Sequence, residues 1–264
     1  MIDFSSYSLP SLSPTLISSI DELAYYGQDN EKNTLVYQDQ DISRYRLKEN
    51  IYEYEYDFNQ YGFRDKWNID TDKSNIAFFG CSFTFGEYIA SENIFPAQVA
   101  NRMPCNGFNF GLPGIGIERI AYIFSAVNRV IDLDYAVVTL PDWNRLLYLN
   151  NDNHGIRYLD LVHSSGHNGE INRIKKSIYT FGDDYFIHQS IRNINWMIDI
   201  AASHSVKLLL SSWSPPTNAL IENIFPDHAI GIFPTLDRAL DQAHPGTQSH
   251  TIYTKQIIQN LSIK

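Results

Sequence analysis

Short apolar runs alternate with stretches of helix-like apolar spacing along most of this chain after residue 74. Five runs are expected to form strands, namely 75–79, 108–110, 135–140, 206–210 and 229–233. Four stretches with helical spacing lie between or after them, namely 94–102, 117–130, 185–204 and 247–261. This alternation predicts an α/β fold, a three-layer αβα sandwich with a parallel sheet of about five strands.

Two regions depart from this rhythm. Residues 1–58 are punctuated by Ser and Pro, and 51–57 alternate aromatic and acidic side chains. They predict an N-terminal extension that packs on the main domain, which we place at 59–264. Residues 148–180 are rich in Asn, Gly, Ser and His, and we interpret them as an insertion near the active face. A plain surface excursion explains this segment equally well.

The segment 75–86 carries the strongest chemical signal. The strand predicted at 75–79 runs into Gly80-Cys-Ser-Phe-Thr-Phe-Gly86, a turn of small residues before a predicted helix. Such a turn presents the hydroxyl of Ser82 where backbone N–H groups converge. A serine needs a base to become a nucleophile, and Asp241-Gln-Ala-His244 offers a carboxylate and an imidazole three residues apart. A serine hydrolase is therefore the leading hypothesis, and an ordinary helix-capping serine is the alternative.

These blocks resemble the SGNH/GDSL hydrolase family. The serine block is 80–86, with Cys81 where the family more often has Asp. Asn109-Phe-Gly-Leu-Pro-Gly114 resembles the glycine block, and 241–244 resembles the final Asp-x-x-His block. Asn59-Gln-Tyr-Gly-Phe-Arg64 is similar to a lead-in often found before the serine block. The blocks follow the family's order and cover most of the chain.

The resemblance implies a flavodoxin-like SGNH fold and a catalytic triad. Ser82 would attack the substrate, His244 would act as the base, and Asp241 would orient the imidazole. The oxyanion donors would be the N–H groups of Ser82 and Gly114 and the side chain of Asn144. The chain departs from the family at 141–145, where Pro-Asp-Trp-Asn-Arg replaces a Gly-x-Asn-Asp pattern. This departure puts the role of Asn144 in doubt.

Several assignments have rivals within the sequence. Asp237 competes with Asp241, and Gly111 and Gly116 compete with Gly114. Arg145 and Trp143 are candidates for substrate binding, although such a tryptophan is more often a core residue. Cys81 adjoins Ser82, but no nearby cation in the sequence favours a reactive thiol.

No metal or other cofactor is expected. His163 and His167 are four residues apart, but the Ser-Ser-Gly between them indicates a loop and no His-Glu-x-x-His pattern is present. The two cysteines, Cys81 and Cys105, are too few to predict a disulfide framework, and we interpret both as free thiols.

Composition narrows the partners. The 264 residues carry a formal net charge of −10 and a pI of about 5.2, which argues against nucleic acid and anionic membranes as partners. No apolar run is long enough to span a membrane, and no signal peptide is visible, so a cytoplasmic or otherwise soluble location is expected.

Two functions of different classes follow. The first is an esterase that hydrolyses an acyl ester, with an O-acetylated carbohydrate as one candidate substrate. The second is a weakly active or inactive binding or structural module, such as a virion or surface-assembly component. In the second case residues 1–58 would mediate homo-oligomer or assembly contacts.

Overall fold

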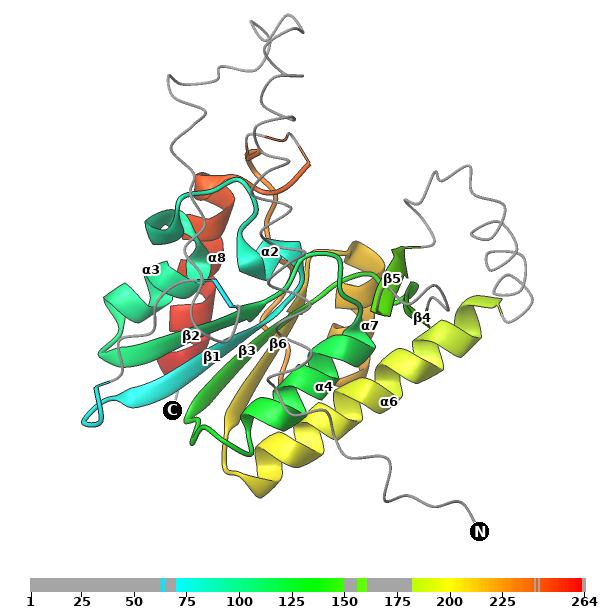
Figure 1. Cartoon of the computed structure of the whole chain (residues 1–264), viewed down its shortest axis with the longest axis horizontal. Coiled ribbons are helices and arrows are strands. Elements are labelled where there is room, and N and C mark those ends of the chain that lie inside the picture. The colour runs from blue at the N-terminus through cyan, green and yellow to red at the C-terminus, as the bar shows by residue number, and fades with distance from the viewer. Residues whose placement is uncertain are drawn as a thin grey trace, which may run out of the picture.

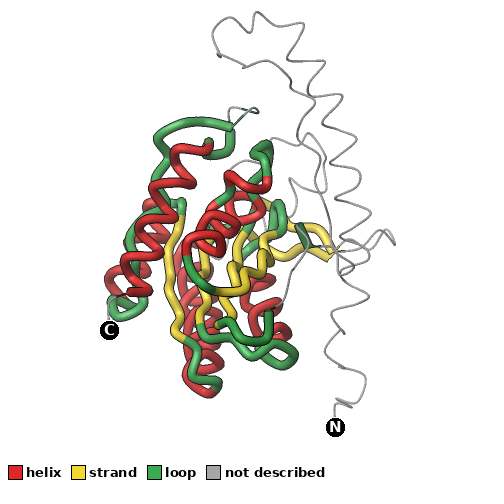
Figure 2. Tube along the Cα trace, turned by 90° about the vertical axis from the view of Figure 1, so that its left-hand side faces the viewer, coloured by secondary structure: helices red, strands yellow, loops and turns green. Residues whose placement is uncertain are grey.

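A parallel sheet between two layers of helices forms the framework of the protein. The computed structural model describes residues 63–64, 70–149, 156–160, 182–239, 241 and 243–262. Its main sheet has four strands in the order β2-β1-β3-β6. Helices cover both faces of this sheet, with α3 and α8 on one side and α4 and α6 on the other (Figures 1 and 2). The strands are β1 Ser74–Gly80, β2 Cys105–Gly111, β3 Tyr135–Leu140 and β6 Lys207–Ser212.

The central strands are apolar throughout because both of their faces are covered. Ile76 to Phe79 in β1 are all buried, and β1 pairs in parallel with β2 on one side and β3 on the other. Phe79 stacks on Phe110 of β2 at 5.2 Å between ring centroids. Continuous apolar runs of this kind are typical of parallel strands buried on both faces.

The helices are amphipathic or very short. In α4, the side chains that face the sheet recur at helical spacing, while Glu118 lies exposed in the first turn. The helices described are α2 Ser82–Phe85, the 3-10 helix η4 Ser91–Asn93, α3 Phe95–Arg102, α4 Ile117–Val127, α6 Gly182–Ser203, α7 Pro215–Ile224 and α8 Thr247–Ser262. The three-layer arrangement expected from the sequence is therefore confirmed.

The expected fifth strand at 229–233 is not formed, so the count of about five was too high by one. This segment runs beside β6 and makes an isolated parallel bridge between Ala229 and Leu210. The N–H of Ile230 donates to the carbonyl of Leu210 at 3.0 Å, and the N–H of Phe233 donates to that of Ser212 at 2.9 Å. Gly231 lies between them at a φ of 84°, outside the extended region, and interrupts the ladder.

The region after β3 contains a hairpin that the sequence did not predict. Strands β4 Arg145–Leu149 and β5 Ile156–Asp160 pair antiparallel as a separate two-stranded sheet. The predicted insertion at 148–180 therefore begins inside a strand, and most of its remainder lies outside the described residues. The predicted extension 1–58 lies entirely outside them, so the proposed division into 1–58 and 59–264 stays a prediction.

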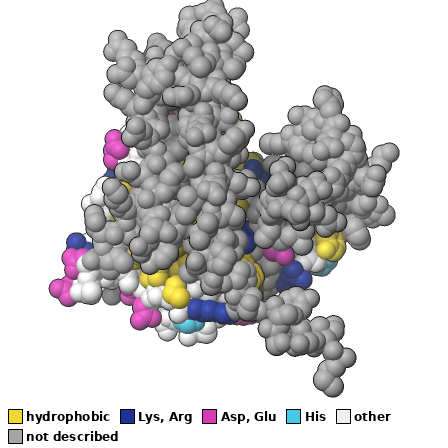
Figure 3. All heavy atoms as spheres, in the orientation of Figure 1, with side chains coloured by type: hydrophobic (Ala, Val, Ile, Leu, Met, Phe, Trp, Pro, Cys, Tyr) yellow, Lys and Arg dark blue, Asp and Glu magenta, His cyan; other side chains and the backbone are white. Residues whose placement is uncertain are grey.

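Acidic and basic side chains are interspersed on the described surface that is visible in Figure 3, without a continuous basic face there. Of the helices that the structure describes, none combines the length and the apolar character that a bilayer crossing needs.

Candidate active site

Ser82 lies at the carboxyl end of β1, as its position in the sequence predicted. It is the first residue of α2, which follows β1 after a single residue, Cys81. The turn is tight, because a Cβ at Gly80 would lie 2.1 Å from Oγ1 of Thr84. The Ser82 side chain is buried, and Cys81 Sγ, at 4.0 Å, is the partner described for its hydroxyl. As the first helical residue, Ser82 keeps an N–H group with no acceptor inside the helix.

The glycine block holds α2 against the end of β2. Asn109 accepts a hydrogen bond from the N–H of Gly111 at 2.9 Å and donates one to the carbonyl of Thr84 at 3.2 Å. A Cβ at Gly111 would lie 2.3 Å from the backbone nitrogen of Phe85. Gly111 is therefore explained by close packing between strand and helix.

The other two glycines of this region differ. A Cβ at Gly116 would lie 2.6 Å from the carbonyl oxygen of Arg145, so Gly116 is also explained by packing. Gly114 has a φ of 73°, and a Cβ there would meet no described atom within 4 Å. Gly114 is therefore explained by its left-handed backbone conformation and not by packing, and its role as an oxyanion donor stays a prediction.

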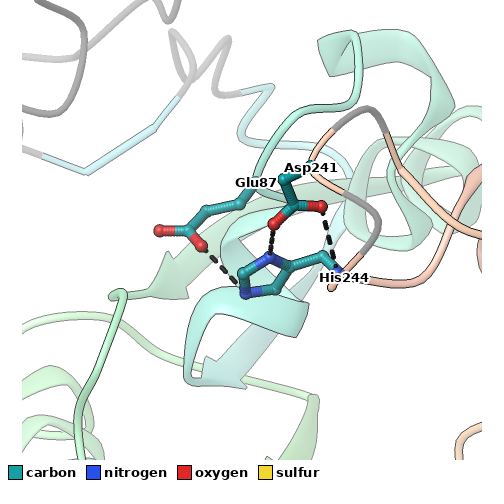
Figure 4. Close-up of side chains that lie close together, drawn as sticks. All are labelled: Glu87, Asp241 and His244. Atoms are coloured by element: carbon teal, nitrogen blue, oxygen red, sulfur yellow. Dashed lines mark hydrogen bonds and ion pairs between the residues drawn. The ribbon is translucent and has the colours of Figure 1, made fainter. Parts of the chain in front are cut away.

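His244 is held between two carboxylates. Its Nδ1 is hydrogen bonded to Asp241 Oδ2, and its Nε2 lies 2.8 Å from Glu87 Oε2 (Figure 4). The other oxygen of Asp241 accepts the N–H groups of Ala243 and His244, each at 3.1 Å. The Asp241 side chain is thus fixed by its own turn and presents one oxygen to the imidazole.

Asp237, the rival carboxylate, is engaged elsewhere. Its oxygens accept the N–H groups of Gln248 and Ser249, each at 2.8 Å, at the beginning of α8. It also accepts the hydroxyl of Ser249 at 2.6 Å. Asp237 therefore caps α8, and Asp241 is the partner of the imidazole.

The two carboxylates favour a protonated His244. Burial by itself lowers the pKa of His244, but the hydrogen bonds and negative charges of Asp241 and Glu87 outweigh it and raise the pKa to about 10. Burial likewise opposes ionisation of Asp241, but its hydrogen bond from His244 holds its pKa below the usual value. In this arrangement both ring nitrogens carry protons, so Nε2 cannot accept a proton from Ser82. The described residues contain no hydrogen bond between Ser82 and His244.

Among the described residues, one group could hold a metal ion by spacing alone. It consists of Glu87, Asp241 and His244, whose ligand atoms lie within 4.8 Å of one another. However, each carboxylate faces a different ring nitrogen, and the lone pairs of Nδ1 and Nε2 point apart. The arrangement fits a hydrogen-bonded imidazolium better than a single ion bound by all three groups. The histidines His163 and His167 lie outside the described residues.

The segment after β3 contains Asn144 and Arg145, the two residues whose roles the sequence left open. The side-chain oxygen of Asn144 is buried and has no hydrogen-bond partner among the described residues. The guanidinium of Arg145 lies 5.4 Å from the ring centroid of Trp213, which follows β6. Trp143 donates its backbone N–H to Thr217 Oγ1 at 3.2 Å, and its side chain packs partly against the core.

An aromatic wall, formed by Phe83 and Trp213, connects these parts of the site. The two rings stack at 4.9 Å, and Trp213 Nε1 donates to Cys81 Sγ at 3.3 Å. Phe83 also meets the edge of His244 at 5.7 Å between ring centroids. The wall therefore extends from the serine turn to the imidazole, with the Arg145 guanidinium near its Trp213 end.

The sequence interpretation missed Glu87 entirely. A signal did exist, because an acidic residue directly follows the serine block and the turn at Gly86 directs it back over the site. Phe83 and Trp213, which form the aromatic wall, were not assigned to the site either.

No known protein-family model and no curated protein matches the sequence. Solved structures do match it. TesA is 12% identical over 72% of this chain and 98% of its own, with a TM-score of 0.50. The fold is that of the SGNH/GDSL hydrolases.

Two other matches have lower TM-scores. A carbohydrate esterase family 2 enzyme from Myceliophthora fergusii is 14% identical over 74% of this chain and 67% of its own, with a TM-score of 0.47. A lipolytic protein of the G-D-S-L family from Veillonella parvula is 11% identical over 72% of this chain and all of its own, with a TM-score of 0.43.

A buried histidine of α8 makes this fold sensitive to acid. His250 accepts the N–H of Phe95 on Nδ1 at 3.0 Å and is fully buried among aromatic rings. Burial, and then the positive charge of Arg64, lower its pKa to about 3. Between pH 6.5 and about 3, His250 is protonated in the unfolded chain but stays neutral in the folded protein.

The contribution of His250 to stability is therefore complete above pH 6.5 and is lost as pH falls toward 3. We expect the free energy of unfolding to fall by about 1 kcal/mol for each unit by which the pH is lowered over this range. Urea denaturation of His250→Asn should show a shallower acid slope than the wild type. His204→Asn, at an exposed histidine, is the control, and equal slopes for His250→Asn and wild type would contradict the assignment.

Proposed function

We propose that the protein hydrolyses acyl esters with Ser82 as nucleophile, His244 as base and Asp241 as the residue that orients the imidazole. The observation that carries this proposal is the hydrogen bond between Asp241 and Nδ1 of His244, on a loop whose imidazole contacts the ring of Phe83, next to Ser82. A carboxylate on Nδ1 orients the ring so that Nε2 can serve the nucleophile once Nε2 is released from Glu87.

The proposed reaction has two halves. In the first, Ser82 Oγ attacks the carbonyl carbon while Nε2 of a neutral His244 takes the hydroxyl proton. The tetrahedral oxyanion receives N–H groups from Ser82 and Gly114, and the Asn144 amide is the candidate third donor. As the intermediate collapses, the C–O bond to the alcohol breaks and His244 returns the proton to the leaving oxygen. In the second half, water attacks the acyl carbon while His244 takes its proton. The bond between that carbon and Ser82 Oγ then breaks, His244 returns the proton to Oγ, and the acid leaves.

The substrate class that we propose is an ester with a short acyl group, such as an O-acetylated carbohydrate. The support is steric, because Ser82 is 5% exposed and its chain neighbours Cys81 and Phe83 are both covered by Trp213. Arg145, beside Trp213, is the candidate donor to hydroxyl or anionic groups of the alcohol part. The second hypothesis, a binding module without catalysis, is not favoured, because the Asp–His pair that such a module would not need is intact.

Covalent labelling tests this proposal. A fluorophosphonate probe should react with the folded protein, and peptide mapping by mass spectrometry should place the label on Ser82. Hydrolysis of p-nitrophenyl acetate should exceed that of the octanoate, because the crowded serine excludes a long chain. Heat-denatured protein is the control. A label on Cys81 or absence of any label on folded protein would contradict the assignment of the nucleophile.

A further inference from the structure

Glu87 occupies the one nitrogen of His244 that the proposed reaction needs. Its carboxylate is buried, with the side chain 8% exposed, and lies 2.8 Å from Nε2. Asp241 holds Nδ1, so the imidazole has a carboxylate at each nitrogen (Figure 4). A bond of this kind between charged groups is strong and shields the ring from other partners.

The backbone that carries Glu87 is fixed on both sides. Gly86, just before it, has a φ of 79°, and a Cβ there would lie 2.2 Å from Ile94 Cγ2. Tyr88, just after it, has a φ of 58°, a conformation that residues with a side chain seldom adopt. Arg64 donates to the carbonyls of Phe85, Gly86 and Ile89, which flank Glu87 on either side. The carboxylate is therefore held in place by its surroundings, as strained positions near functional sites often are.

We propose that Glu87 is a positioning residue that latches His244 in a resting arrangement and must release Nε2 before Ser82 can be deprotonated. This inference rests on the proposed function. The latched imidazole carries a proton on each nitrogen, and removing one leaves two buried carboxylates beside a neutral ring. The latch therefore delays the loss of the Nε2 proton until the solution is alkaline or until a bound substrate displaces Glu87.

The charged and titratable groups around His244 come from three elements. Glu87 and Tyr88 lie on the segment after α2, and the ring of Tyr88 is 6.4 Å from that of His244. Asp241 lies on the same turn as His244. His250 of α8 is close enough that the positive charge of His244 lowers the pKa of His250. The carboxylates are the groups that raise the pKa of His244, and Asp241 is needed to orient the ring. Glu87 is thus the group whose removal would free the base without disorienting it.

The rate of ester hydrolysis as a function of pH tests the latch. For wild-type protein, kcat/KM for p-nitrophenyl acetate should still be rising at pH 9.5, because His244 is still losing its proton there. For Glu87→Gln the rate should level off within the range from pH 6 to 9.5. At pH 7.5 the variant should be at least tenfold faster, since each unit by which the midpoint falls gives a factor of about ten. Glu92→Gln, which removes an exposed carboxylate of η4, is the charge-matched control and should follow the wild type.

A direct titration separates failure of the latch from failure of the proposed function. NMR of the histidine ring carbons should show a high titration midpoint for His244 and a lower one in Glu87→Gln, whether or not either protein hydrolyses the ester. Glu87→Asp, which keeps the charge but is one methylene shorter, should also lower the midpoint. It replaces Glu87→Gln in this test if the Gln variant does not fold. Equal midpoints in the wild type and both Glu87 variants would overturn the latch. A shifted midpoint without ester hydrolysis would retain the latch and reject the proposed reaction.

Discussion

Replacement of Ser82 by alanine is expected to lower kcat for p-nitrophenyl acetate by about 10⁴-fold or more, because no other group replaces the nucleophile. The folded structure should be nearly unaffected. The hydroxyl has only a long contact to Cys81 Sγ among the described residues, so its loss leaves no buried donor or acceptor without a partner. Steady-state hydrolysis and circular dichroism measure the two effects.

Ser125→Ala is the matched control for this experiment. Ser125 lies in α4 and its exposed fraction is 5%, the same as that of Ser82. It should retain wild-type hydrolysis, so a loss confined to Ser82→Ala cannot come from removing a buried hydroxyl as such. Hydrolysis by Ser82→Ala within tenfold of the wild type would rule out this nucleophile, and attention would move to the neighbouring thiol of Cys81.

The strands that the sequence predicted with the correct bounds are those buried on both faces. For β1 and β3, the apolar runs match the observed strands to within one residue at each end, because both faces of these strands are buried. The second strand was predicted as 108–110, but β2 begins at Cys105. Its first residues include Asn106, whose side chain donates to the carbonyl of Asp70 at 2.8 Å. A buried polar side chain satisfied by a distant carbonyl gives no apolar signal in the sequence.

Helix α7 shows a different limit. It begins at Pro215, and two successive prolines indicate a break when only neighbouring residues are considered. Proline is accepted in the first turn, where its missing N–H has no acceptor within the helix. The same residues therefore mark the beginning of a helix, and the sequence interpretation left this segment without one.

The candidate site divides along the same lines. The contact between Asp241 and His244 was predictable, because the two are three residues apart and one turn brings both side chains together. The contact between His244 and Glu87 was not, because these residues are far apart in the sequence and meet only when the loop before α8 folds over the segment after α2. Asp237 lies one helical turn before Asp241 in the sequence, and only its bonds to α8 distinguish it.

Arg64, the last residue of the lead-in, binds the backbone at the end of the serine block and just after it. Arg64 is 1% exposed, and its guanidinium donates to the carbonyl of Phe85 at 2.9 Å and to those of Gly86 and Ile89. It also lies over the ring of Phe85, 5.3 Å from its centroid. The fork of N–H groups on arginine can reach several carbonyls of one bend at once, whereas the ammonium of lysine acts from a single point.

Arg64→Met is therefore expected to lower the free energy of unfolding by about 3 kcal/mol or more, since it leaves several buried carbonyls without their donor. Arg64→Lys keeps the charge but cannot span the bend, and its stability should lie between those of the wild type and Arg64→Met. Arg102→Met, at the exposed end of α3, should change the free energy of unfolding by less than about 0.5 kcal/mol. Urea denaturation measures all three.

The same substitution links the stability of this bend to the site. Glu87 lies between the carbonyls that Arg64 holds, so the loss of Arg64 should also loosen the carboxylate from Nε2 of His244. The histidine titration midpoint of Arg64→Met should then move down together with its stability, while that of Arg102→Met should not move. A stable Arg64→Met with an unchanged midpoint would mean that the carbonyls find other donors, and that Arg64 does not maintain the bend on which the position of Glu87 depends.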